Sequence, residues 1–102
     1  DTGTIWFSKN GTWQNSATIS EIGAGTTTNS AYTGKSFATN GIVPSVSAYQ
    51  SSGNAIVEAN FGGGTSFTVS SGNADANGFG NFEYAVPSGY FSLCSKNLAE
   101  FG

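Results

Sequence analysis

Apolar and polar residues alternate most regularly between residues 42 and 61. The odd-numbered residues of segment 55–61 are apolar, whereas the even-numbered ones include Glu58 and Asn60. Segment 42–49 also alternates, and the residues between the two segments are of turn-forming types. We therefore predict an antiparallel hairpin with one solvated face, in which Pro44 marks an edge position or a bulge because it has no N–H to donate.

A second hairpin is predicted near the start of the chain. The β-rich segment Thr4–Phe7 runs into Asn10-Gly11, and Trp13 then begins a return strand. Asn-Gly favours a type I′ turn because both central residues of that turn need a positive φ.

The rest of the chain predicts short strands joined by polar loops. Expected strands are 18–22, 67–69, 82–87 and 89–94, and the loops are 23–30 and 70–80. No segment predicts a helix of useful length, and there is no internal repeat. Residues 1–102 are therefore expected to form a single all-β module.

The amino-acid composition agrees with a β-structure and excludes two classes of partner. The chain has eight Phe, four Tyr, two Trp and no Met, and aromatic residues suit pleated sheets. With only three basic residues and a net charge of −3, it lacks the basic surface that nucleic acids and anionic membranes require. No apolar run approaches the roughly 20 residues that span a bilayer. We predict neither a nucleic-acid nor a membrane partner.

The chain has few residues that could support catalysis or bind a metal. The absence of His excludes Ser-His-Asp and Cys-His systems and the usual zinc sites, and Cys94 is expected to be a buried, inert thiol. Glu21, Glu58 and Glu83 keep a glycosidase-like carboxylate pair open as an alternative, although solvated carboxylates are the default. We expect no enzyme activity and no cofactor.

Asn73, Asp75 and Asn77 imitate the start of a calcium loop, with oxygen ligands at alternate positions followed by Gly78. The acid that should complete such a loop is missing, because Tyr84 stands at its position. An Asx-rich turn is therefore favoured over calcium. The three residues remain candidates for ligand or partner contact.

Exposed aromatic rings are a further candidate for contact. Tyr32 lies in a polar segment and Tyr49 at a predicted strand end, so both are expected to be exposed. Such rings stack on sugars in binding sites, although amphipathic rings more often only pack within the protein.

Three blocks of the chain together resemble the SPRY (B30.2-like) domain. Residues 1–11 (DTGTIWFSKNG) resemble a strand and hairpin of that family, and residues 44–62 (PSVS…VEANFG) resemble a later strand pair. Residues 78–98 (GFGNFEY…PSGY…LCSKNL) resemble the ending typical of SPRY-like modules in proteins from tailed, particularly marine, phages. The blocks occur in the family's order.

This resemblance implies an antiparallel β-sandwich of the concanavalin-like/SPRY type, or only its C-terminal half, because the family's early strands have no counterpart here. The chain also lacks Met, so we expect a processed chain or a fragment of a longer one. The implied function is that of a non-catalytic phage virion module, such as a capsid decoration, tail or fibre component. It would contact other virion subunits in an oligomeric assembly and be assembled in the host cytoplasm. The alternative is a lectin-like module that recognises a host surface glycan.

Overall fold

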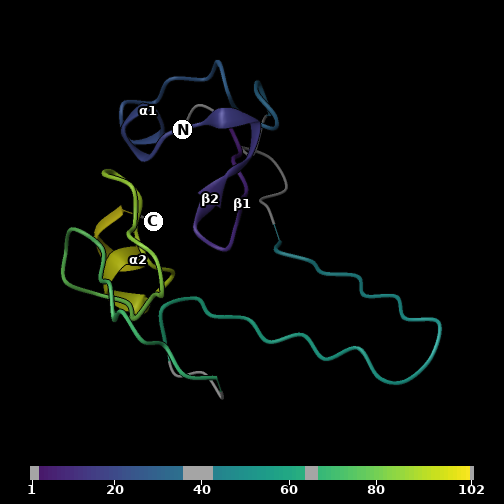
Figure 1. Ribbon diagram of the computed structural model, residues 1–102. Coiled ribbons are helices and arrows are strands. Elements are labelled where there is room, and N and C mark those ends of the chain that lie inside the picture. Colours follow the sequence, from purple (N-terminus) through teal and green to yellow (C-terminus); the bar gives the residue numbers. More distant parts are fainter. Residues whose placement is uncertain (1–2, 36–42, 64–66, 102) are drawn as a thin grey trace.

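The computed structural model describes residues 3–35, 43–63 and 67–101 (Figure 1). Its elements are β1 (Ser8–Lys9), β2 (Thr12–Trp13), the 3₁₀ turn η1 (Gln14–Ser16), α1 (Ile19–Gly23) and α2 (Ser95–Phe101). Isolated bridges join Ile5 to Tyr32 and Asn73 to Phe82. Most of the described chain is therefore held by turns, bridges and side-chain hydrogen bonds.

The hairpin expected at Asn10-Gly11 is confirmed. β1 and β2 pair antiparallel, with Lys9 opposite Thr12, so the two turn residues form the loop. Their φ angles are 50° and 76°, as a type I′ turn requires. Gly11 also lies so close to the Tyr84 ring that an added Cβ would stand 2.7 Å from a ring carbon. The turn therefore needs glycine for both conformation and space.

The prediction of an all-β sandwich is wrong. In the described residues the only sheet is the two-stranded β1–β2 ribbon. The expected strands 42–49 and 55–61 are absent from the described residues, with Ile42 lying outside them. The expected strands 18–22, 67–69, 82–87 and 89–94 are absent from the described residues as well. A strand pattern becomes a strand only when a neighbouring backbone takes up its N–H and C=O groups, and alternation alone supplies no such neighbour.

Two helices replace expected strand or tail segments. At α1, the Thr18 hydroxyl accepts from the Glu21 N–H at 3.2 Å, while the Glu21 carboxylate accepts from the Thr18 N–H at 2.8 Å. This capping box satisfies donors that a helix start leaves open, and its T-x-x-E signature is visible in the sequence. α2 begins directly after Cys94, where the Leu98 N–H donates to the Cys94 carbonyl at 2.9 Å.

The hydrophobic core is small. Among the described residues, Ile22 is the only large aliphatic or aromatic side chain that is buried, at 2% exposure. It lies on α1 and lines a cavity of about 220 Å³ with Trp6, Trp13, Pro87 and Tyr90. The Trp6 and Tyr90 rings meet edge to face at 6.1 Å. This cluster joins the N-terminal part of the chain to segment 87–90.

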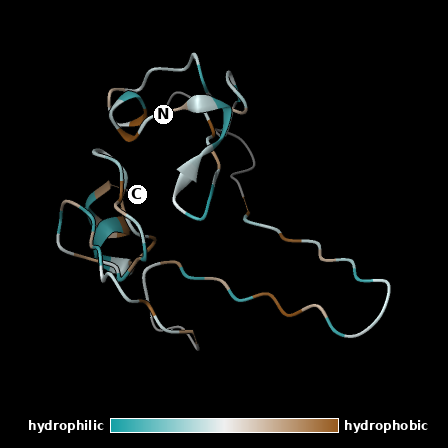
Figure 2. Ribbon diagram, in the orientation of Figure 1, coloured by the Kyte–Doolittle hydropathy of each residue, from teal (hydrophilic) through white to brown (hydrophobic). Residues whose placement is uncertain are grey.

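Residues 43–60, called the arm below, project away from this cluster (Figure 1). Hydrophobic residues recur along the arm (Figure 2), and Val43, Tyr49 and Ile56 are 84%, 92% and 85% exposed. The end of the arm is anchored, because the Asn60 amide donates to the Asn81 carbonyl at 2.8 Å. Gly62, with a φ of 103°, follows this anchor and packs against Ser92.

Because Ile22 is the one large apolar side chain that is buried among the described residues, Ile22→Ala is expected to destabilise the fold by about 2–5 kcal/mol. Ile19→Ala on the same helix is the matched control, since Ile19 is 41% exposed and loses less contact. Urea denaturation followed by tryptophan fluorescence measures both. Equal effects of the two substitutions would contradict the assigned core.

Candidate functional site

The Asp75 carboxylate is the centre of the densest polar network in the described residues. Its Oδ1 accepts from the backbone N–H groups of Asn77 at 2.9 Å and Phe79 at 3.0 Å. Its Oδ2 accepts from the N–H and the hydroxyl of Ser92 and from the Asn97 amide, each at 2.8 Å. Asp75, Ser92 and Asn97 are all buried, so a side chain from the 75–79 turn fixes both segment 92–94 and α2.

Asn97 extends this network from α2. Its amide nitrogen also donates to the Ser92 carbonyl at 2.9 Å, and its oxygen accepts from the Asn77 amide at 2.9 Å. The buried amide is therefore bonded at both ends, which avoids the cost of an unsatisfied polar group. Sequence reasoning missed Ser92 and Asn97 as partners of Asp75, although Asn97 lies in the LCSKNL motif that carries part of the resemblance.

The network sets the charge state of Asp75. Burial by itself raises the pKa of this carboxyl, but the hydrogen bonds from Ser92, Phe79 and Asn97 outweigh burial and hold the pKa well below its ordinary value of 3.8. Asp75 is therefore ionised near neutral pH. Because its oxygens already accept five hydrogen bonds, a cation would have to displace those donors.

The other residues of the calcium-like stretch also have assigned roles. The Asn73 amide donates to the carbonyls of Phe82 and Glu83, at 3.3 and 3.0 Å, beside the Asn73–Phe82 bridge. The Asn77 N–H bond to Asp75 has the form of an Asx turn. Among the described residues, no cluster of three or more acidic, Cys or His side chains is placed to hold a metal. Ligand or partner contact by Asn73, Asp75 and Asn77 stays a prediction.

The candidate carboxylates take part in local structure. The hydroxyl and N–H of Ser70 donate hydrogen bonds to the Glu83 carboxylate and lower its pKa. These bonds hold segment 70–71 against Glu83, which directly follows the Asn73–Phe82 bridge. The Thr18 hydroxyl and N–H lower the pKa of Glu21 in the α1 capping box. Cys94 is half-buried rather than buried, and the Asn97 N–H lowers the pKa of its thiol.

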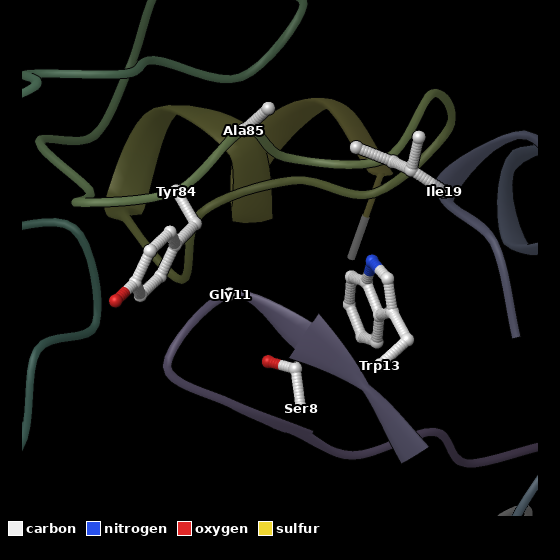
Figure 3. Close-up of a pocket in the computed structure, with 6 residues that line it drawn as sticks. All are labelled: Ser8, Gly11, Trp13, Ile19, Tyr84 and Ala85. Carbon is white, nitrogen blue, oxygen red and sulfur yellow. The ribbon is translucent and has the colours of Figure 1, made fainter. Parts of the chain in front are cut away.

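Beside this network lies an apolar depression, called the aromatic groove below. It comprises two adjoining cavities of about 270 and 440 Å³ that share Ser8, Trp13, Tyr84 and Ala85. Figure 3 shows the Trp13 and Tyr84 rings on two sides of the smaller cavity, with the Ser8 hydroxyl between them. The larger cavity adds Phe67, Phe82, Pro87 and Phe91. The groove therefore offers ring faces and a hydroxyl to a ligand or a partner.

Tyr32 and Tyr49 are exposed, at 53% and 92%, but the structure does not bring them into the groove. Tyr32 meets Phe7 edge to face at 6.4 Å and has the Lys35 ammonium 5.7 Å from its ring centre. Tyr49 lies on the arm. From the sequence, Tyr32 and Tyr49 are the predicted contact rings, and Trp13 is placed in the hairpin. The groove could not be predicted, because nothing in the sequence places Tyr84 opposite Trp13.

Comparisons with protein-family models, curated proteins and solved structures find no match to this chain. The SPRY resemblance therefore rests on the three motif blocks alone. None of the described helices is long and apolar enough to cross a membrane.

Asp75→Asn is expected to lower the melting temperature at pH 7, because the new amide N–H₂ must face donors from Ser92 or Asn97. The folded-state pKa of Asp75 lies below its unfolded value, so its contribution to stability is present above that value and is lost as the pH falls below about 4. The variant is therefore expected to show a smaller fall in melting temperature between pH 6 and pH 2.

Differential scanning calorimetry across that pH range measures both effects. Glu100→Gln is the matched control, because it removes the same charge from an exposed position of α2. A variant that melts like the unmodified chain at pH 7 would show that Asp75 does not organise this region.

Proposed function

We propose that this chain is a non-catalytic structural or binding module of a phage virion that acts through protein–protein contacts with other virion subunits. The observation that carries the proposal is the amount of apolar side-chain surface left exposed beside a core centred on Ile22. Large exposed apolar patches mark interaction surfaces, and the described chain exposes them on the arm, in the groove and on α2.

The excess exposure can be measured by comparing the accessible surface area of the chain with that of a globular monomer of the same mass. The chain has 7452 Å² of accessible surface, whereas a folded monomer of 10.4 kDa has about 5,400 Å². Its radius of gyration is 14.9 Å, compared with about 13 Å for a globular chain of this length. The excess of about 2,000 Å² matches what one subunit of a stable assembly buries.

The virion assignment is supported by the SPRY-like motif blocks, whose ending is typical of tailed-phage proteins. Two of the pieces of that ending, GFGNFEY and LCSKNL, meet at Asp75 through the Phe79 N–H and the Asn97 amide. The motif thus corresponds to one hydrogen-bonded unit in the folded chain. Assembly in the host cytoplasm and location in the virion follow from the same assignment.

Antibody labelling of intact particles from the source, viewed by electron microscopy, tests this proposal. We expect label on the particles: label over the capsid indicates decoration, and label at tail or fibre tips indicates receptor contact. Preimmune antibody is the control. Absence of the chain from purified particles, by labelling and by mass spectrometry, would overturn the virion assignment.

A lectin-like module is the second candidate, and the aromatic groove is the observation in its favour. Trp13 and Tyr84 present ring faces with the Ser8 hydroxyl between them, a combination that suits sugar rings (Figure 3). Exposed Tyr32 and Tyr49 are alternative stacking rings.

If protein contact is the function, a glycan array is expected to retain none of the labelled chain. Saturable retention that Tyr84→Ala abolishes would instead favour the lectin candidate and place its site in the groove. Tyr32→Ala and Tyr49→Ala are matched controls, because each removes an exposed ring that lies elsewhere. Retention lost in one of these controls would place the sugar site at that ring.

A further inference from the structure

The arm carries little charge and exposes several apolar side chains. Glu58 is its only charged residue, and Val46 is 73% exposed in addition to the three side chains given above. Natural proteins protect exposed extended segments with charges, which keep other chains from pairing with them. An arm that carries almost no charge is therefore suited to contact with protein.

The aromatic groove has complementary properties. Its larger cavity, of about 440 Å³, has the volume to receive several apolar side chains, and five aromatic residues are among those that line it. Asn60, where the arm ends, is one of the lining residues. The rest of the arm projects away from β1, β2 and α2 (Figure 1). One chain thus carries both an apolar extended segment and an apolar depression beside its base.

We propose that the arm of each chain docks in the aromatic groove of a second copy, so that two copies form a reciprocal dimer. This inference rests on the proposed function and names the chain itself as the first partner. A two-fold arrangement covers both arms and both grooves at once, whereas a different partner would have to supply an arm and a groove of its own.

Length and area both fit this dimer. Residues 43–50 span roughly 26 Å when extended, close to the shortest dimension of the molecule, 28 Å. An extended segment of this length can therefore reach across most of a second copy. Burying the excess of about 2,000 Å² on each chain gives an interface of about 4,000 Å², within the range of obligate homodimers.

The mass of the purified chain in solution, measured by light scattering during size-exclusion chromatography, tests this dimer. We expect twice the mass of one chain for the unmodified protein. Val46→Asp is expected to shift the dissociation constant by at least tenfold, because it replaces an exposed apolar side chain of the arm with a charge. Ser47→Asp is the matched control: it adds the same charge at the next residue, where it replaces a small polar side chain instead of an apolar one.

Cross-linking tests the contact without relying on destabilisation. In a Cys94→Ser background, one chain carries Val46→Cys and another carries Ala85→Cys, and the two are mixed and oxidised mildly. A mixed disulfide dimer is expected. Thr28→Cys in place of Ala85→Cys gives the background level of cross-linking, because Thr28 is exposed and does not line the groove.

Each outcome bears on the dimer. A monomer, a dimer that Val46→Asp and Ser47→Asp weaken equally, or oligomers that keep growing with concentration would overturn it. If the chain is monomeric but labels virions, the proposed function stands and only this inference fails. If the dimer forms but the chain is absent from particles, this inference stands and the virion assignment fails.

Discussion

The C-terminal half of the described chain depends on the hydrogen bonds that the Asp75 carboxylate accepts. Five donors converge on its two oxygens, and they come from the 75–79 turn, from Ser92 and from α2. A buried carboxylate is costly unless such bonds satisfy it, so the network forms completely or the region does not fold in this way. Through Ser92 and Gly62, it also reaches the base of the arm and one wall of the aromatic groove.

This dependence on polar contacts follows from the small apolar core. Hydrophobic burial normally dominates the free energy of folding, yet the described residues bury one large aliphatic side chain and leave many exposed. Hydrogen bonds specify geometry well but contribute modestly to net stability, because folding exchanges them for bonds to water. A chain organised in this way gains most from a surface that covers its apolar residues. The proposed dimer and the proposed place in an assembly both meet that need.

The groove and the arm are built by different means. The groove follows from tight local geometry: the Asn10-Gly11 turn sets Trp13 beside Ser8, and Gly11 lets the Tyr84 ring approach. The arm is fixed at its C-terminal end, where Asn60 and the nearby Gly62 contact the 80–92 region. The groove is thus held in place within one chain, while the arm presents side chains outward.

The sequence by itself determined the features that depend on neighbouring residues. Asn10-Gly11 specified the β1–β2 turn because its residues adopt positive φ at low cost, and Asp75 with Asn77 specified an Asx turn. Thr18 and Glu21 specified α1 by their capping box, a local signal that the strand prediction overlooked. Only the tertiary structure decided the rest: that the alternating segments 43–50 and 54–60 form no strands, that Ser92 and Asn97 complete the Asp75 network, and that Tyr84 faces Trp13. The physical reason is that these outcomes depend on which distant segment occupies the neighbouring space, and alternation within a segment carries no information about its neighbour.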